Sequence, residues 1–378
     1  MQNIPSHEKS IRLMFTAGEG NVMVGSDFSQ QEPRLLSQYS QDENMINAYK
    51  AGKDLYATIA CGVYKNTYWD NMEHHEDGTP NPDGKKRRGA MKNLLLGIMY
   101  QRGAPSIAEQ LGITLQEAQK IIDDFYSSFP KVRDYITSTQ DFCRKYGYVE
   151  DLWGRRRRLP DILLPKYKIV DRNKLSGDFN PLLGSKNILS NIDNPLITKY
   201  KKQLATSRNR KDYEAIKEKA LKENIEIHDN SGFIASAERQ CVNARIQGGA
   251  ATMTKVAMIK IYNDKQLKDL GFKLLLAVHD ELIGECPEVN KDAVADRLTY
   301  VMKTCVDDIC SVPFKCDADI STCWYLNDYQ DVIRNEFSKM LQDGVDEKLI
   351  FEQLCEKYSE STQEQMEETL HELLSKVN

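Results

Sequence analysis

The sequence predicts an α+β protein, with a mainly antiparallel sheet and a larger helical region. Two observations lead to this prediction. The apolar runs 22–24 and 274–277 are short and lie close to glycine and charged residues, which is typical of strands. Between residues 45 and 150, apolar side chains recur three and four positions apart, most clearly in 115–127 and 132–144, which is typical of amphipathic helices. We therefore expect a sheet built from distant parts of the chain, with helices between them.

Residues 11–40 predict a strand, a turn and a helix. The apolar run leads into Asp27, and Pro33 fits the first turn of the helix, where its missing N–H costs no hydrogen bond. An aspartate at the exit of a strand is most often a turn residue or a helix cap. Asp27 alone therefore indicates no particular chemistry.

Residues 88–100 predict a helix with an unusual combination of side chains on one face. They are Arg88, Lys92, Leu96 and Tyr100, which recur every four residues. At 3.6 residues per turn, each step of four rotates by only about 40°, so the four side chains share one broad face. Two cations, an aliphatic side chain and a phenol would suit a nucleoside triphosphate, with the cations on its phosphates and the other two against its base.

The surroundings of this helix leave a second explanation open. The polar stretch 73–86 contains two prolines and two glycines and predicts a mobile loop. The basic run 85–88 is then equally well explained as a solvated surface. Spacing alone does not distinguish phosphate binding by Arg88 and Lys92 from that simpler explanation.

The last third of the chain predicts two helices and a hairpin. A long helix covers 235–262, and a pair of glycines near its middle predicts a bend or an interruption. Residues 271–286 predict a strand hairpin with His279 and Asp280 at its tip, and 291–310 predict another helix.

Asp280 therefore follows an apolar strand, as Asp27 does. If the two strands are neighbours in one sheet, their carboxylates converge and can bridge a pair of divalent cations about 3.5–4 Å apart. Such a site is suited to the transfer of phosphoryl groups.

Seven short segments follow one another along the chain in an order that can be compared with known families. They are QNIP (2–5), DFSQQEPR (27–34), RGAMKNLLLGIMY (88–100), FPKV (129–132), GRRRRLP (154–160), AERQCVN followed by QG (237–243, 247–248) and VHDE (278–281). Together they resemble the ordered motifs of family A DNA polymerases, the bacterial DNA polymerase I family. The resemblance covers roughly residues 2–160 and 230–327.

The resemblance implies roles for individual residues. Asp27 and Asp280 would bind two Mg²⁺ ions, with the backbone carbonyl of Phe28 as a further ligand and Glu281 as a nearby catalytic carboxylate. Lys92 would hold the triphosphate and contribute to catalysis.

Other residues would position the nucleotide and the DNA. Glu32, hydrogen-bonded to Tyr100, would exclude a ribose 2′-hydroxyl, while Tyr100 would stack at the template-base position. Arg88, Tyr56 and Leu96 would complete the nucleotide site. The implied DNA-binding residues are Arg155, Arg156, Arg239, Asn243, Gln247 and His279. Local pairing would equally explain the helix amides among them, and a solvated hairpin would explain the arginines at 155–158.

At four positions in or near these segments the chain has a residue that differs from the family's usual one. Leu96 replaces an aromatic residue, Tyr56 a histidine, Gln101 a glycine and Ala277 a polar residue. None of the four changes affects the two aspartates.

The resemblance implies template-directed addition of deoxynucleotides to a primer 3′-hydroxyl, with release of pyrophosphate. The implied partners are primer–template DNA, deoxynucleoside triphosphates and a second polypeptide carrying a thumb and possibly an exonuclease, as in a split, bacteriophage-like replication polymerase. One alternative is a single-subunit RNA polymerase, which Glu32 disfavours. Another is a non-catalytic DNA-binding subunit, which the presence of Asp27, Asp280 and Arg88 disfavours.

The resemblance also implies a domain order in which a thumb and an exonuclease are absent. It is palm in 1–44, fingers in 45–150 with the motif helix at 87–101, palm again in 151–327 with an insertion at 161–229, and an acidic helical extension in 328–378. A DNA-contacting flap, a partner surface and a passive loop are all open for the insertion. The extension is expected to pack on the body of the protein.

Composition adds further expectations. The net charge of −5 hides an acidic end, because residues 328–378 hold 13 Asp and Glu against 5 Lys and Arg, which leaves +3 for the rest. Basic clusters can bind phosphates whatever the total charge. The nine cysteines have neither zinc-site nor redox spacing, which predicts reduced thiols. No apolar run approaches the roughly 20 residues that span a membrane, so we expect a cytoplasmic protein, in a bacterial host if phage-encoded.

Overall fold

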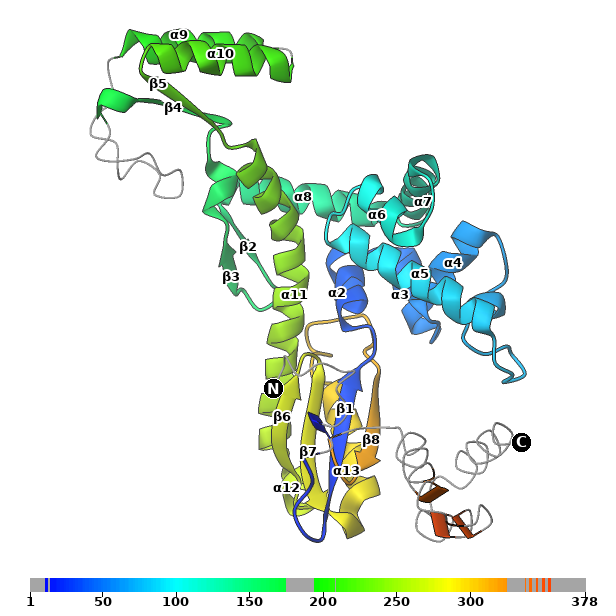
Figure 1. Ribbon diagram of the computed structural model, residues 1–378. Coiled ribbons are helices and arrows are strands. Elements are labelled where there is room, and N and C mark those ends of the chain that lie inside the picture. The colour runs from blue at the N-terminus through cyan, green and yellow to red at the C-terminus, as the bar shows by residue number, and fades with distance from the viewer. Residues whose placement is uncertain are drawn as a thin grey trace. The chain divides into compact units, whose positions relative to one another are not determined.

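The computed structural model describes residues 11–12, 14–174, 194–207 and 209–324, and eight single positions between 337 and 354. The QNIP segment and most of the acidic extension therefore lie outside the described residues. By its internal contacts the chain divides into two compact units, Met1–Gln31 with Met253–Asn378, and Glu32–Thr252. The expected α+β class is confirmed (Figure 1). The implied palm and fingers boundaries stay a prediction.

The first unit is built on a four-stranded antiparallel sheet in the order β6-β7-β1-β8 (Figure 1). Its buried core includes Met23, Val278, Ile283 and Trp324, and α13 packs against β1 and β8. The elements are β1 (Asn21–Phe28), α12 (Lys265–Asp269), β6 (Lys273–Val278), β7 (Glu281–Pro287), α13 (Lys291–Lys303) and β8 (Cys316–Ser321).

The hairpin expected at 271–286 is confirmed, with His279 and Asp280 as its two-residue turn. The helix expected at 291–310 is shorter than predicted, because α13 ends at Lys303. Cys305, Val306 and Cys310 are buried as the apolar pattern requires, but they lie beyond the end of α13.

The second unit is mainly helical. Its helices are α2 (Gln31–Ser40), α3 (Glu43–Lys50), α4 (Leu55–Tyr64), α5 (Pro82–Met99), α6 (Ala104–Leu111), α7 (Leu115–Ser128), α8 (Pro130–Tyr146), α9 (Pro195–Thr206) and α10 (Arg210–Lys222). Its strands form two small ladders, β2 (Tyr148–Glu150) with β3 (Arg156–Arg158), and β4 (Tyr167–Asp171) with β5 (Ile225–Asp229). The helices expected at 115–127 and 132–144 are confirmed as α7 and α8.

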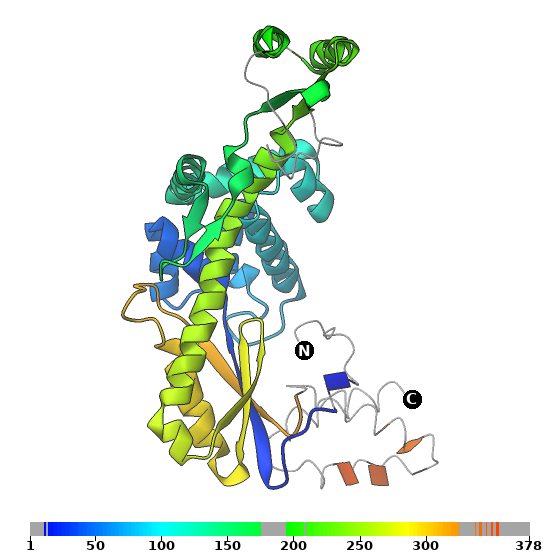
Figure 2. The same ribbon diagram turned by 90° about the vertical axis from the view of Figure 1, so that its left-hand side faces the viewer.

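The long helix α11 (Ser231–Asn263) has residues in both units and is unbroken at the glycine pair 248–249 (Figure 2). The expectation of a bend or an interruption there is therefore wrong. Close packing accounts for Gly249, because a Cβ at this position would lie 2.7 Å from the hydroxyl oxygen of Tyr39.

The α5 helix begins at Pro82, within the stretch 73–86 that was expected to be a loop. The side chain of Asn81 caps it by accepting a hydrogen bond from the backbone N–H of Gly84. Gly84 is needed because a Cβ there would lie 2.0 Å from the carbonyl oxygen of Met72. These features start the helix six residues before Arg88, where the periodicity placed its beginning.

The described part of the expected insertion folds into a small module, which we call the 164–230 module. Its core includes Ile169, Tyr200 and Leu204, and α9 and α10 pack against each other beside the β4–β5 ladder (Figure 1). The expected insertion is therefore not a passive loop, since its described part contains two helices and a two-stranded ladder.

Two other expectations from composition are tested by the described residues. The eight cysteines among them are free thiols, and six are buried. No described helix is both long enough and apolar enough to cross a membrane.

Candidate functional site

The two expected metal-binding aspartates come together in the first unit. The β1–β7 ladder pairs Asp27 with Glu281, and Asp280 immediately precedes Glu281 in the hairpin turn. The carboxyl group of Asp27 hydrogen-bonds the side chain of Asp280. The convergence that the sequence predicted is therefore present. Asp27 lies within β1 and not at its exit, and β7 separates β1 from β6, the strand that precedes Asp280.

Electrostatics in this carboxylate cluster favour a bound cation. Burial, and then the charges of Asp280 and Glu281, raise the pKa of Asp27 to about 7, although solvent reaches its side chain. Burial also raises the pKa of Glu281 to about 7, with Asp319 and Asp280 adding to the effect and Arg12 opposing it. Because ionising all these groups together is costly, a divalent cation would relieve the repulsion.

The donor set suits an open metal site. Among the described residues, no group of three or more His, Cys, Asp or Glu side chains is arranged to hold a metal ion. Mg²⁺ usually takes one or two carboxylates and completes its coordination with water and substrate phosphates. Asp27 and Asp280 fit that pattern.

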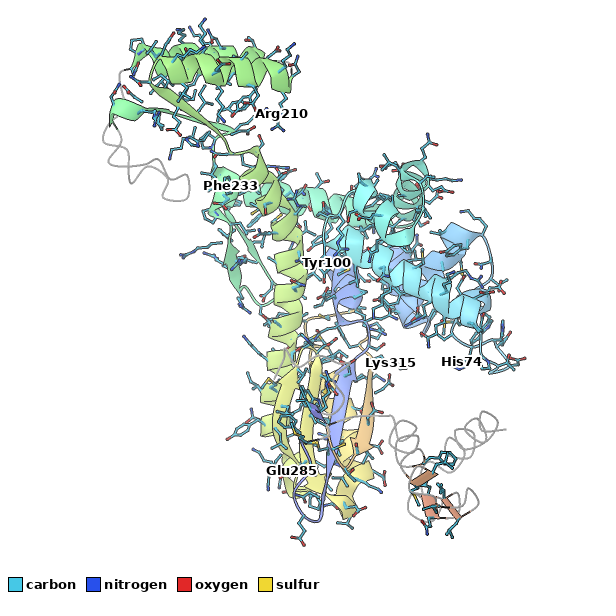
Figure 3. The ribbon with its side chains drawn as sticks, viewed as in Figure 1. His74, Tyr100, Arg210, Phe233, Glu285 and Lys315 are labelled. Atoms are coloured by element: carbon cyan, nitrogen blue, oxygen red, sulfur yellow. The ribbon has the colours of Figure 1, made fainter. Side chains whose placement is uncertain are left out.

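The sequence did not single out the acidic residues of β8. Asp317 pairs with Asp27 in the β1–β8 ladder, so Asp27 lies between Glu281 and Asp317 across three strands. Lys315, labelled in Figure 3, holds Asp317 at 3.2 Å through its ammonium group. The alternation of Asp317 and Asp319 in a short segment was the available signal.

Arg88 of α5 is held by two carboxylates in the second unit. Asp54 Oδ2 accepts hydrogen bonds from its Nε at 3.1 Å and its Nη2 at 2.8 Å. Glu73 Oε1 accepts from Nη1 at 2.9 Å. The guanidinium also lies 5.4 Å from the ring centre of Tyr56, which is buried. Arg88 is thus fixed in place, with Tyr56 packed against it.

The rest of the predicted nucleotide face varies in exposure. Lys92 is exposed and makes no ion pair with the described residues, while Leu96 and Tyr100 are half-buried. Lys92 is therefore a cation of this face that no described carboxylate occupies.

A chain of hydrogen bonds connects Glu32, Tyr100 and Gln247. The hydroxyl of Tyr100, at the end of α5 (Figure 3), donates to Glu32 Oε2 at 3.3 Å, as expected. It accepts from Gln247 Nε2 at 3.2 Å. Burial, and then the charge of Glu32, raise the pKa of Tyr100, so the phenol stays protonated and can donate.

The backbone conformation of Gln101, the residue after Tyr100, accounts for the glycine that the family usually has at this position. Gln101 has φ +55°, in the left-handed region that favours glycine. The backbone N–H of Gln101 bonds the Ile98 carbonyl, and that of Arg102 bonds the Gly97 carbonyl, which together form a Schellman motif. A glycine would fill this position without strain.

A basic hollow of about 440 Å³ lies between the β2–β3 ladder and α11. Arg155, Arg156, Asn243 and Gln247 line it, so the structure brings together four of the predicted DNA-binding residues. The buried Oδ1 of Asn243 accepts no hydrogen bond from the described residues.

Two of the predicted DNA-binding residues do not line the hollow, whereas one arginine that was not predicted does. Arg245, which the sequence analysis missed, ties the ladder to α11 by donating to the Glu150 carbonyl at 3.0 Å and stacking over Tyr39. Arg239 is exposed on α11 and does not line the hollow. His279 lies in the hairpin turn of the first unit, with φ +58°.

The family model for DNA polymerase family A matches residues 1–175 and 193–326. This chain belongs to DNA polymerase family A. The match includes residues 193–229, which are part of the expected insertion.

Relatives within family A include DNA polymerase I of Chloroflexus aurantiacus, 29% identical over 86% of this chain and 26% of that protein. The thermostable DNA polymerase I of Thermus aquaticus is 30% identical over 86% of this chain and 30% of its own length. The chain therefore spans less than a third of these relatives.

Among solved structures, the POL domain of Pol1 from M. smegmatis, in complex with DNA primer-template and dNTP, matches with a TM-score of 0.60. It is 26% identical, over 86% of this chain and 44% of that chain. This likeness agrees with the α+β polymerase-domain fold.

Proposed function

We propose that this chain catalyses template-directed addition of deoxynucleotides to a primer 3′-hydroxyl, with release of pyrophosphate. The observation that supports this most directly is the hydrogen-bonded pair Asp27–Asp280, whose repulsion a divalent cation would relieve. Membership of DNA polymerase family A, whose members are metal-dependent, agrees with it. The complex of the mycobacterial neighbour with DNA primer-template and dNTP also supports DNA and nucleotides as ligands here.

The proposed metal ligands are Asp27, Asp280 and the backbone carbonyl of Phe28. Two Mg²⁺ ions bound there would lower the pKa of the attacking hydroxyl and neutralise charge on the transferred and leaving phosphates. Asp27 accepts a hydrogen bond from the Phe28 backbone, which orients its carboxylate. Glu281 lies opposite Asp27 in the ladder and adds negative charge beside the pair.

The proposed nucleotide contacts come from α5 and its neighbours. Lys92 would bind the triphosphate as a flexible point charge, whereas Arg88 would offer a pre-oriented guanidinium. Leu96 would give apolar contact in place of the usual aromatic ring. Glu32, held by Tyr100, would occupy the space that a ribose 2′-hydroxyl needs.

The proposed DNA contacts divide into two kinds. Arg155 and Arg156 would bind backbone phosphates, because they are exposed cations at the edge of the basic hollow. Asn243 and Gln247 are amides and would hydrogen-bond base edges or sugars. Arg239 and His279 are also proposed to contact the DNA.

The experiment is single-nucleotide primer extension with the variants Asp27→Asn and Asp280→Asn. Each variant should lose more than 95% of Mg²⁺-dependent activity, because neutral amides bind Mg²⁺ poorly, and should bind duplex DNA nearly as well as wild type. Asp296→Asn is the matched control, since Asp296 is exposed on α13. Residual activity above a few per cent in either variant would reject these metal ligands. An inactive wild-type chain would instead favour a non-catalytic DNA-binding role.

We also propose that long synthesis requires a second polypeptide with additional duplex-binding parts. The support is the coverage, since this chain matches only 44% of the mycobacterial polymerase domain. Fewer phosphate contacts should weaken DNA binding and shorten the products. Primer extension at physiological salt, with and without a thumb-bearing chain, tests this. Long products from the purified protein alone would contradict it.

A further inference from the structure

The 164–230 module has the charge of a nucleic-acid-binding surface. Residues 164–230 contain 14 Lys and Arg against 9 Asp and Glu, a net charge of +5 in a chain whose total is −5. Its own buried core, which includes Ile225 and Ile227, makes it a folded platform and not a loop. Such a local excess of positive charge attracts polyanions whatever the total charge of the chain.

Two tyrosines form a stacked pair on this module. Tyr167 of β4 and Tyr213 of α10 have ring centres 5.5 Å apart and planes inclined by 19°. The ammonium group of Lys166 lies 5.1 Å from the ring centre of Tyr167, and that of Lys217 lies 6.0 Å from that of Tyr213. Both rings are half-buried, whereas both lysines are exposed on long flexible stems. A ligand can therefore displace either ammonium group from its ring.

A hollow of about 650 Å³ adjoins these side chains, within the range of roughly 300–1,000 Å³ that small-molecule sites occupy. Both tyrosines and both lysines line it, together with Arg210 at the start of α10 (Figure 3). Apart from Ser231, the first residue of α11, its lining residues belong to the module. None of them belongs to the carboxylate cluster, the α5 face or the basic hollow.

The acidic groups that line this hollow already have partners. Glu226 contacts His228 at 3.0 Å and Arg172 at 3.6 Å. Asp229 accepts from the backbone N–H of Ser231 at 2.8 Å. Glu214 lies 3.7 Å from Arg210, whose side chain is 91% exposed, so that pair is weak.

The cations are less committed than the acids. Lys166 and Lys217 form no ion pair with any residue that the structure describes. The hollow thus offers two uncommitted ammonium groups and a weakly held guanidinium next to aromatic rings.

We propose that this hollow binds single-stranded nucleic acid. Unpaired bases would stack against Tyr167 and Tyr213, and the adjoining phosphates would take up the ammonium groups of Lys166 and Lys217. Aromatic faces beside cations bind single strands with little sequence preference, because every base has a π-face and every nucleotide a phosphate. Paired bases in a duplex do not expose their faces in this way. The lining is mostly polar, which disfavours an apolar protein segment as the ligand.

The test measures binding of a fluorescein-labelled 12-nucleotide oligothymidylate to the full chain by fluorescence anisotropy, across a range of salt concentrations. The double variant K166Q/K217Q should bind more weakly. Its slope of log affinity against log salt should be shallower by about 1.4, because each phosphate contact on a single strand contributes about 0.7. K202Q/K219Q is the matched control, with the same charge change at exposed positions of α9 and α10 outside the hollow.

Stacking is tested separately. Tyr213→Leu should weaken binding by about 5- to 150-fold, the range found when one base loses its stacking partner, whereas Tyr213→Phe should retain affinity within about twofold. The lysine variants keep the test decisive if Tyr213→Leu unfolds the module, because Tyr213 packs against its core.

Three results would overturn the proposal. They are an unchanged affinity and salt slope in K166Q/K217Q, an equal loss in K202Q/K219Q, and tighter binding of duplex than of single strand at this surface.

The proposal goes beyond nucleotide addition and can be tested separately from it. K166Q/K217Q should keep the wild-type rate of single-nucleotide extension at saturating primer–template. If this variant binds single strands as well as the wild type does, the single-strand proposal fails but the polymerase proposal does not.

Discussion

Replacing Glu73 by glutamine should tighten the binding of deoxynucleotides. In the structure, Glu73 occupies one side of the Arg88 guanidinium through Nη1, while Asp54 occupies the other side through Nε and Nη2. A triphosphate that binds Arg88 competes most directly with Glu73, which comes from the loop before α5. Glutamine keeps the shape of the side chain and its hydrogen-bond acceptor but removes the negative charge.

The size of the effect follows from the exposure of the pair. The side chains of Arg88 and Glu73 are 25% and 40% exposed, and the N···O distance is 2.9 Å. Pairs of this exposure contribute roughly 0.2–1 kcal/mol in double-mutant cycles. In the wild type, a triphosphate that binds Arg88 must break the Arg88–Glu73 ion pair. Because Glu73→Gln removes that pair beforehand, the KM for deoxynucleotide should fall by about 1.4- to 5-fold. Asp54 is not a suitable target, since it also caps α4 through the Ala57 N–H.

The assay is rapid-quench single-nucleotide incorporation at saturating primer–template, with the nucleotide concentration varied. Glu73→Gln should lower KM and leave kcat within about twofold. The difference should shrink as salt is raised from about 0.05 to 0.5 M, because exposed charges are increasingly screened. Glu76→Gln is the control, since Glu76 is exposed in the same loop and has no ion pair with the described residues.

The reasoning would be refuted by an unchanged or increased KM in Glu73→Gln. An equal decrease in Glu76→Gln would also refute it, because the effect would then come from general loop charge. Either result would mean that the carboxylates hold Arg88 as a structural residue and that the triphosphate binds elsewhere on α5.

Three further predictions concern the second unit. Gln101→Gly should raise the free energy of unfolding by about 0.5–1 kcal/mol in urea denaturation, because glycine adopts φ +55° without strain. A lower free energy of unfolding would show that the hydrogen bond from the Gln101 side chain to the Ile98 carbonyl outweighs this strain. Gly249→Ala should lower Tm, at a cost of about 1–3 kcal/mol, because its Cβ would lie 2.7 Å from Tyr39 Oη; an unchanged Tm would mean that the tyrosine moves aside. Glu32→Ala should raise ribonucleotide relative to deoxynucleotide incorporation, measured by competition on one template, and an unmoved ratio would assign sugar selection to another residue.

Local patterns in the sequence predicted much of what local forces decide. The strand at Asp27, the hairpin turn at Asp280, the helices α7 and α8 and the shared face of α5 all follow from periodicity and turn chemistry over a few residues. The errors were local too. The start of α5 at Pro82 depends on the Asn81 cap and on close approach to Met72, and neither changes the apolar pattern.

Only the tertiary structure decided which residues meet. Asp27 lies between Glu281 and Asp317 because of strand registers that join residues about 250 to 290 positions apart. Tyr167 pairs with Asp229 across the whole 164–230 module for the same kind of reason. A one-residue slip in a ladder moves every side chain to the opposite face, and the packing of the whole core sets that register.

The charge partners of Arg88 show the same division. The sequence by itself determined that Arg88 and Lys92 lie on the same face of α5, because residues four positions apart share a helix face. It contained no sign that Asp54 and Glu73 would hold that cation, since an ion pair depends on distances of a few ångströms that arise only when separate segments pack.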